Sequence, residues 1–141
     1  MKQLILITAV LVALAGWATA HEPSAMNQGS SEIVTPRFSH AIPNIPGKSL
    51  IAVEVSYPPG GKSPAHRHAN SAFIYGYVVS GSIRSQVEGE APHVYKAGES
   101  FFEAPGSHHL VGGNASDTEA AKLLAVFVVD TNDKDLTTPD K

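Results

Sequence analysis

The feature that most constrains this chain is a succession of short apolar runs, each bounded by Gly, Pro, Asn or Asp. The runs are rich in Val, Ile, Tyr and Phe, which favour strands, and none shows the 3.6-residue period of an amphipathic helix. This alternation of short apolar runs and turn residues predicts an all-β domain with about seven strands. The predicted strands are residues 50–57, 72–80, 82–88, 93–97, 100–104, 108–112 and 122–130.

The turns between these runs favour a closed architecture. Ser80-Gly81 and Gly89-Glu90 are typical of tight turns that join antiparallel neighbours. Strands of this length in an open sheet would leave exposed edges, whereas a small barrel or jelly roll protects them. We therefore predict a small β-barrel over residues 49–130.

Two flanking segments differ from the predicted barrel in composition. Residues 21–48 are rich in Pro, Ser, Asn and Gly and have no sustained period, which predicts an extended N-terminal arm. The arm either wraps its own domain or pairs with a neighbour, so the sequence allows both a monomer and a homodimer. Residues 131–141 are polar and predict a loose C-terminal tail.

The first 20 residues are typical of a secretory signal peptide. Lys2 precedes an apolar run over residues 4–17, and Ala18-Thr19-Ala20 supplies the small side chains of a cleavage site. The apolar run is shorter than the roughly 20 residues of a spanning helix. We expect cleavage after Ala20, a mature chain with one domain and no membrane span, and a location in the bacterial periplasm.

The composition and the absence of certain motifs argue against several classes of protein. The chain has no cysteine, so it is neither a disulfide-stapled scaffold nor a cysteine-anchored lipoprotein. Its formal net charge is −3 and its Lys and Arg residues are scattered, so it lacks the basic footprint of a nucleic-acid-binding protein. It also lacks a G-x-S-x-G elbow and a Gly-rich phosphate loop, which argues against hydrolases and nucleotide-binding proteins.

His66 and His68 form an H-x-H pair between the predicted strands at residues 50–57 and 72–80. Side chains at i and i+2 of a strand point to the same face, about 7 Å apart at Cα. Both imidazoles can therefore reach one metal ion. Two polar residues at a strand entrance would give the same pattern, so the pair alone does not establish a site.

The wider spacing resembles the two motifs of the cupin superfamily. The first motif matches the stretch from Gly60 through the H-x-H pair to Gly81, and the second matches "GESFFEAPGSHH" from Gly98. The resemblance covers residues 50–130. It implies a double-sheet β-barrel with metal ligands pointing into its mouth, and a small molecule as the partner of the site.

The same resemblance implies which histidines bind the metal. His66 and His68 match the first two ligands, and His109 matches the last. His108 stands one residue earlier, so it should point to the opposite face of its strand. The resemblance therefore implies a mononuclear centre with three histidine ligands.

The chain departs from the cupin motifs at two positions. Ala104 replaces the first proline of the second motif, and no glutamate follows His68, because the expected position falls on Ile74. Three neutral imidazoles leave the full charge of a divalent ion uncancelled and leave coordination positions open. On that basis we expect anionic or chelating substrates.

The ligand chemistry narrows the identity of the metal. Imidazole suits first-row transition ions, whereas magnesium and calcium prefer oxygen ligands. We predict one divalent transition metal, with iron preferred and nickel, copper, manganese and zinc as alternatives.

Three further residues are candidates for the pocket. Glu103 is the nearest carboxylate in the motif register, and it is a replacement ligand, a catalytic acid/base or a solvent-facing rim residue. Tyr75 and Tyr77 either line the pocket or belong to the plain core.

These features support three functional hypotheses. The first is a metalloenzyme of dioxygenase type that acts on a small organic molecule. The second is a non-catalytic periplasmic module that binds a metal or small ligand, because Ile74 replaces the ligand glutamate. The third is an isomerase, which depends on Glu103 alone. Whether the protein is an enzyme is open at this point, since one fold serves many chemistries.

Overall fold

The computed structural model describes residues 31–141, so the predicted signal peptide and the first part of the arm lie outside the described residues. The described range contains strands and no helix, which confirms the all-β prediction. In particular, no helix able to span a membrane occurs within it. The strands are β1 (Ile33–Ala41), β2 (Lys48–Tyr57), β3 (Lys62–Ser63), β4 (His66–His68), β5 (Phe73–Ser80), β6 (Ser82–Val87), β7 (His93–Lys96), β8 (Ser100–Glu103), β9 (His108–Asn114), β10 (Ala121–Asp130) and β11 (Thr137–Pro139).

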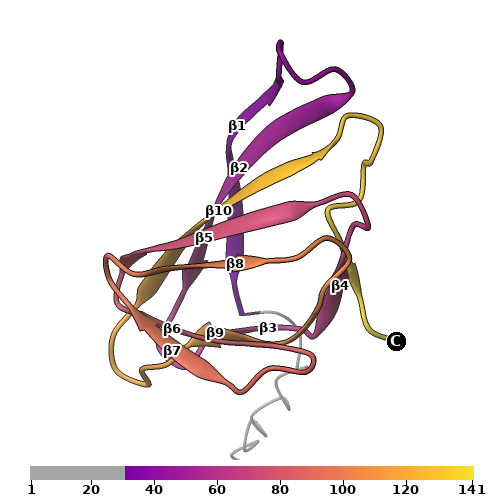
Figure 1. The fold of residues 1–141 in the computed structure, drawn as a ribbon. Coiled ribbons are helices and arrows are strands. Elements are labelled where there is room, and N and C mark those ends of the chain that lie inside the picture. Colours follow the sequence, from indigo (N-terminus) through magenta and orange to yellow (C-terminus); the bar gives the residue numbers. More distant parts are fainter. Residues whose placement is uncertain (1–30) are drawn as a thin grey trace, which may run out of the picture.

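The strands form two antiparallel sheets that face each other (Figure 1). The five-stranded sheet has the order β1-β2-β10-β5-β8. The six-stranded sheet has the order β11-β4-β9-β6-β7, with β3 paired to β9 beside this path. All seven strands predicted from the sequence are present, as β2 and β5 to β10. The small double-sheet barrel predicted from the sequence is therefore confirmed.

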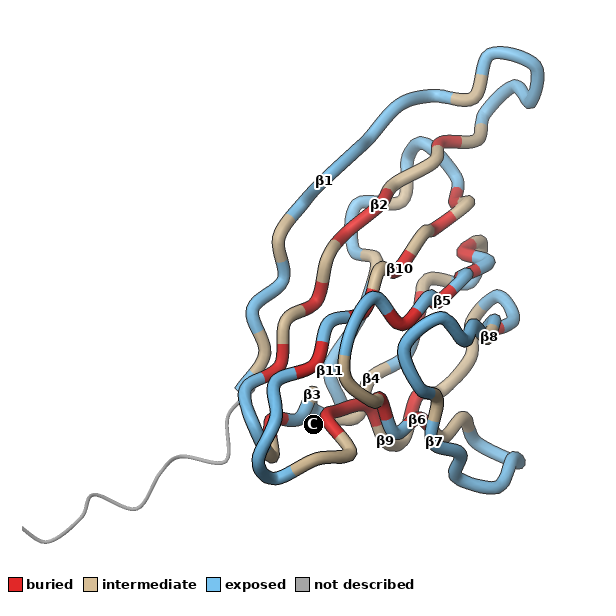
Figure 2. Tube along the Cα trace, turned by 90° about the vertical axis from the view of Figure 1, so that its left-hand side faces the viewer, coloured by how far each residue is buried: buried red, intermediate tan, exposed pale blue. Residues whose placement is uncertain are grey.

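The core lies between the two sheets and follows the two-residue period of the strands. Along β10, buried residues alternate with more exposed ones, and the inward set includes Leu123, Phe127 and Val129. Figure 2 shows the same alternation as a series of buried positions along β2, β10 and β5. Burial of these inward apolar side chains stabilises the packing of the two sheets.

The predicted arm contributes a strand to the barrel. Residues 33–41 form β1, which pairs antiparallel with β2 over nearly its whole length. Nearly all residues of β1 are exposed, on both faces of the strand (Figure 2). The β1–β2 hairpin also extends past the ends of the neighbouring strands (Figure 1). Pairing within the chain is thus observed, while much of the apolar surface of the arm stays uncovered.

The polar C-terminal segment is not a loose tail throughout. Residues 137–139 form β11, which pairs with β4. In this ladder Thr137 is opposite His68 and Pro139 is opposite His66. Because β4 pairs with β9 at only two positions, β11 gives the short histidine strand a second neighbour. The C-terminal segment therefore helps to hold the register of the histidine pair.

Candidate metal centre

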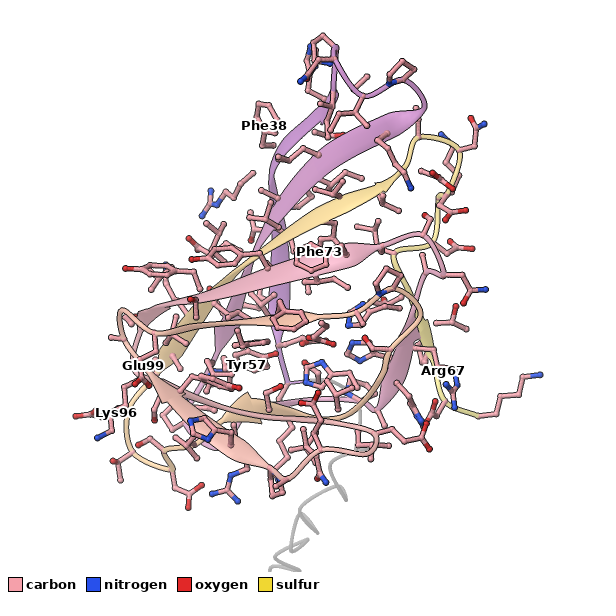
Figure 3. All side chains as sticks on the ribbon, viewed as in Figure 1. Phe38, Tyr57, Arg67, Phe73, Lys96 and Glu99 are labelled. Carbon is pink, nitrogen blue, oxygen red and sulfur yellow. The ribbon has the colours of Figure 1, made fainter. Side chains whose placement is uncertain are left out.

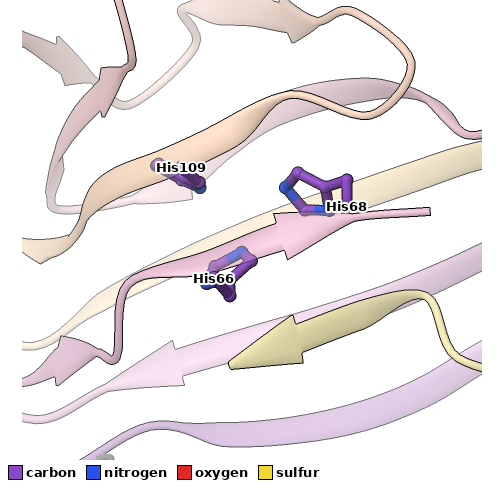
Figure 4. Close-up of side chains that lie close together, drawn as sticks. All are labelled: His66, His68 and His109. Atoms are coloured by element: carbon purple, nitrogen blue, oxygen red, sulfur yellow. The ribbon is translucent and has the colours of Figure 1, made fainter. Parts of the chain in front are cut away.

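Three histidine side chains converge between the sheets (Figure 4). His66 and His68 come from β4, and His109 comes from β9, where it is the Cα partner of His66. One ligand atom from each ring lies within 4.8 Å of the other two. Nitrogen atoms bound to one ion at about 2.1 Å lie at most about 4.2 Å apart. A small inward movement of the rings therefore suffices to bind a common ion.

The hydrogen bonds around these rings favour metal binding. The Nδ1 atom of His66 lies 2.8 Å from the carbonyl oxygen of Pro64, which only accepts, so Nδ1 carries the proton and Nε2 keeps its lone pair. The Nε2 atom of His109 lies 3.0 Å from the hydroxyl oxygen of Ser85. Each ring is thus oriented by a neighbour through one nitrogen, so Nε2 of His66 and Nδ1 of His109 are the candidate ligand atoms.

His68 provides the strongest indication of a ligand. His68 is only 7% exposed, and its Nδ1 atom has no hydrogen-bond partner within the described residues. Its Nε2 atom has one polar neighbour, the Glu103 carboxylate at 2.9 Å. An unsatisfied buried polar group costs about 1–3 kcal/mol. A bond from Nδ1 to a metal ion would remove that cost, so the residues present fit a divalent ion.

Glu103 lies beside the three histidines. Its Oε2 atom is 2.9 Å from Nε2 of His68, and its Oε1 atom is 3.4 Å from Nδ1 of His109. The Ser107 hydroxyl donates a hydrogen bond of 3.3 Å to Oε2. The residue is 4% exposed. Glu103 is therefore a buried part of the site, and the hypothesis of a solvent-facing rim residue is wrong.

The position of Glu103 relates directly to the missing motif glutamate. In the ladder between β5 and β8, Glu103 is the Cα partner of Ile74, the position where the cupin motif expects the carboxylate. Directly opposed residues on neighbouring strands point to the same face of the sheet. The carboxylate absent from β5 is thus supplied from the adjacent strand. A sequence pattern along one strand cannot show this substitution, because it depends on how two strands pair.

The pKa values of Glu103 and His109 are both lowered, which keeps the two side chains in the protonation states that bind metal ions. Burial alone would raise the pKa of Glu103, but the polar contact with His68 and the neighbouring His109 outweigh it and lower the pKa below its usual value. Burial is the main reason why the pKa of His109 is also lowered. A carboxylate and neutral imidazoles are the protonation states that bind metal ions.

A cavity of about 360 Å³ opens beside these side chains. This volume lies within the range of small-ligand sites. Most of its lining is apolar and includes Val55, Leu123 and Phe127 of the five-stranded sheet. Tyr57 also lines it, between the two sheets (Figure 3). The barrel thus provides a largely apolar chamber with the histidines at one side.

Tyr75 and Tyr77 do not line this cavity. Along β5 the buried residues are Ile74, Gly76 and Val78, and the first two of these line the cavity. Tyr75 and Tyr77 are 42% and 36% exposed on the opposite face. The prediction that they belong to the pocket is wrong, and so is the alternative that they belong to the core. The strand is apolar in both phases, so the sequence does not show which phase points inward.

His108 is not among the residues that line the cavity. Its Nε2 atom lies 2.8 Å from Oδ2 of Asp140, and the Arg67 guanidinium donates to its Nδ1 atom at 3.1 Å. These contacts connect the C-terminal segment to β4 and β9. They account for His108 without a metal.

The comparisons with known proteins agree with this architecture. The Cupin domain family matches residues 53–127, which is more than half of the chain. The chain belongs to the cupin superfamily. No curated protein matches this cupin in sequence.

Solved structures of other cupins have the same fold. An uncharacterized protein with a double-stranded β-helix domain from Klebsiella pneumoniae has a TM-score of 0.62 and 16% identity, with 82% of this chain and 88% of that chain covered. A cupin from Shewanella frigidimarina has a TM-score of 0.55 and 23% identity, with 75% and 83% covered. At these identities the likeness concerns the fold alone.

An oxalate oxidase solved with the substrate analogue glycolate has a TM-score of 0.55 and 25% identity, over 71% of this chain. This cupin spans about half of the oxalate oxidase, since 52% of that chain is covered. The metal-binding potential of this cupin therefore rests on its own group of three histidines.

Proposed function

We propose that this cupin binds one divalent transition metal through His66, His68 and His109, with iron preferred over nickel, copper, manganese and zinc. The observation that carries the proposal is the convergence of three imidazoles, together with the buried Nδ1 atom of His68, which has no hydrogen-bond partner within the described residues. The chemistry of three nitrogen donors and one nearby carboxylate supports a first-row ion rather than magnesium or calcium.

In this proposal Glu103 takes the part of the glutamate that Ile74 cannot supply. Its two oxygen atoms lie within 3.4 Å of nitrogens of His68 and His109. In that position the carboxylate either joins the coordination or holds a ligating imidazole in place. Both roles cancel half of the charge of a divalent ion.

For the activity, we propose oxidation of a small organic molecule, of dioxygenase type. A bound first-row ion would supply the redox or Lewis-acid chemistry. The apolar lining of the cavity would exclude bulk water, and the buried Glu103 would accept or return a proton beside the substrate. The similarity to an oxalate oxidase at 25% identity supports an oxidoreductase.

The second candidate function is capture of a metal or small ligand without chemistry. One observation favours it: the carboxylate of Glu103 already contacts His68, His109 and the hydroxyl of Ser107. A carboxylate engaged in this way has less freedom to exchange protons with a substrate. This candidate keeps the same metal centre and differs only in the absence of turnover.

Metal analysis and oxygen uptake separate these possibilities. Protein prepared without an affinity tag should contain one ion per chain, and His66→Ala should abolish the increase in thermal stability on adding divalent metals. Oxygen uptake with a panel of phenols, thiols and diketones under iron loading would support the oxidative enzyme. No oxygen uptake by the iron, nickel or copper form with any of these compounds would favour the non-catalytic binding module. If the protein contains no stoichiometric metal, the proposed metal centre is wrong.

We also propose export to the periplasm, which is supported by the apolar run over residues 4–17 and the small residues Ala18 and Ala20. N-terminal sequencing of the protein from a periplasmic fraction tests this proposal. The expected N-terminus is His21, and a protein that keeps Met1 in the cytoplasm would contradict it.

For the oligomeric state we propose a homodimer through the outer surface of the five-stranded sheet. Five aromatic residues on this surface are 36–65% exposed, and we call them the outer aromatic face. They are Phe38, Phe73, Tyr75, Tyr77 and Phe102. Phe38 and Phe73 project from the strands that carry them (Figure 3). Phe73 also stacks on Phe102, with ring centroids 5.8 Å apart.

The area of the outer aromatic face fits a second copy of the chain. Aromatic side chains of about 200 Å² each, exposed to this extent, present roughly 500 Å² of surface. A standard interface buries about 800 Å² on each partner, so the face would form its apolar centre. A twofold axis would place the same face on both partners, which a row crossing all five strands from Phe38 to Phe102 allows.

A further inference from the structure

The C-terminal segment contacts the chain on both sides of the H-x-H pair. The amide N–H of Asp140 donates to the carbonyl oxygen of Ala65 at 3.0 Å, and the amide N–H of Ala69 donates to the carbonyl oxygen of Leu136 at 3.2 Å. These two alanines directly flank the pair. Between them, β11 runs antiparallel to β4 (Figure 4). We call residues 136–140 the C-terminal bracket, because they enclose the strand that carries two of the three proposed ligands.

Strand β4 needs this support because its ladder with β9 is short. The two strands pair at two positions, His66 with His109 and Arg67 with His108. In contrast, β11 is opposite all three residues of β4, although Pro139 at its end has no N–H to donate. Two short strands alone are only marginally stable in water. The C-terminal bracket therefore gives the histidine strand the second neighbour that holds it in place.

Asp140 extends the C-terminal bracket to the strand of the third ligand. Its Oδ2 atom lies 2.8 Å from Nε2 of His108. A carboxylate only accepts hydrogen bonds, so Nε2 carries a proton and donates it to Asp140. His108 directly precedes His109 on β9, while the main chain of Asp140 holds Ala65 on β4. One residue thus joins the two strands at the level where His66 and His109 are opposed.

The C-terminal bracket also forms a wall of the cavity. Leu136, Thr137 and Pro139 line the cavity, and Leu136 packs against the buried core. Asp140 is not among the described lining residues. It therefore acts on the proposed metal only through the positions of β4 and β9.

We propose that Asp140 is a positioning residue of the metal centre, which sets the spacing of His66 and His109 by joining the strands that carry them. This inference rests on the proposed metal centre. Strands that are held in register before the ion arrives lose less conformational entropy when it binds, so the joint should strengthen metal binding. The inference also gives His108 a role beside the three ligands.

Zinc affinity, measured by competition with a chelator, tests the proposal. Asp140→Ala removes the acceptor of the His108 proton, and zinc affinity should fall about threefold to tenfold, as for the loss of one hydrogen bond to a charged group. Asp140→Asn keeps an oxygen that accepts this proton and should retain most of the wild-type affinity. Equal zinc affinity in Asp140→Ala and the wild type would overturn the proposal.

Asp133→Ala is the matched control within the same C-terminal segment. Asp133 accepts a hydrogen bond from the Ser71 hydroxyl, outside the C-terminal bracket. Its substitution should lower Tm, as Asp140→Ala should, but it should leave zinc affinity unchanged. An equal loss of affinity in Asp133→Ala and Asp140→Ala would show that the segment acts through general stability alone, and it would contradict the positioning role.

The visible absorption spectrum of the cobalt-loaded protein separates positioning from stability. The d–d bands of Co²⁺ depend on the geometry of its ligands. Asp140→Ala should therefore change the position or intensity of these bands, whereas Asp140→Asn and Asp133→Ala should keep the wild-type spectrum. Identical spectra in the wild type and Asp140→Ala would contradict the proposed spacing of the ligands.

The metal content of the wild type distinguishes the two levels of failure. If the wild type takes up neither zinc nor cobalt, the proposed metal centre is wrong and the role of Asp140 is wrong with it. If the wild type binds zinc and Asp140→Ala binds it equally well, the metal centre stands and only the role of Asp140 is wrong.

Discussion

The two faces of the five-stranded sheet are both apolar, yet they differ in what they can do. On the inner face, Ile74 and Gly76 of β5 line the cavity, and Glu103 of β8 reaches His68. On the outer face, Tyr75 of β5 and Phe102 of β8 are opposite each other and exposed. The difference teaches that apolar character alone does not identify a site. The inner face carries the candidate site because histidines from the other sheet converge on it.

The largest expected effect is on the inner face. His68→Ala removes a proposed ligand whose buried Nδ1 atom has no hydrogen-bond partner among residues 31–141, so metal affinity should fall at least about 100-fold. Competition with a chelator under zinc or iron loading measures the affinity. His93→Ala on exposed β7 is the control and should change nothing. Unchanged affinity in His68→Ala would remove this residue from the centre.

The opposed pair of Ile74 and Glu103 gives the next largest effect. Glu103→Ile should lower metal affinity about 10–100-fold, because it removes the carboxylate beside His68 and His109. The exchange Ile74→Glu with Glu103→Ile should recover at least about tenfold of the loss, since the two positions face the same side of the sheet. The same chelator competition measures both proteins.

Glu103→Gln keeps the size of the side chain and separates its charge from its packing. It should resemble Glu103→Ile in affinity while retaining more thermal stability. If neither substitution affects metal affinity, Glu103 does not belong to the centre.

A charge on the outer face should affect assembly and leave the metal unchanged. Phe102→Glu places a carboxylate in the middle of the proposed interface and should raise the dimer dissociation constant at least about tenfold. Sedimentation equilibrium measures this constant, and metal analysis should show the same content per chain. Val94→Glu, at an exposed apolar position of β7, is the matched control. A wild-type protein that stays monomeric at every concentration would contradict the dimer.

The smallest effect concerns a surface ion pair of the same sheet. Glu54 lies 3.0 Å from the Arg37 guanidinium and 3.1 Å from the Lys122 ammonium, and the hydrogen bond from Arg37 is the main reason why its pKa is lowered from 4.5. A carboxyl group with a lower pKa in the folded state adds stability above pH 4.5.

This contribution should disappear as the pH falls through the lowered pKa. The difference in Tm between the wild type and Glu54→Gln should therefore be small at neutral pH and absent in strong acid. If the Tm difference between the two proteins grows on acidification, the pKa of Glu54 is not lowered by folding.

Much of the fold could be predicted from local pattern. The strands from β5 to β10 are apolar runs between turn residues, and each is where the pattern predicts it. β1 was not predicted, because Pro36 and the exposed residues of this segment interrupt any two-residue period. β11 is a three-residue strand without an apolar run, and only its pairing with β4 makes it a strand. Short strands of this kind depend on their partners more than on their own composition.

The candidate site divides in the same way. The sequence by itself determined the three histidines, the absence of the motif glutamate and an all-β chain, because these depend on residue identity and on spacing along one strand. Tertiary structure decided that Glu103 replaces Ile74, that Tyr75 and Tyr77 point outward, and that Glu32 shares the cavity with the histidines. These facts depend on which residues of different strands are opposed. Strand register is set by the packing of the whole barrel rather than by any local stretch of sequence.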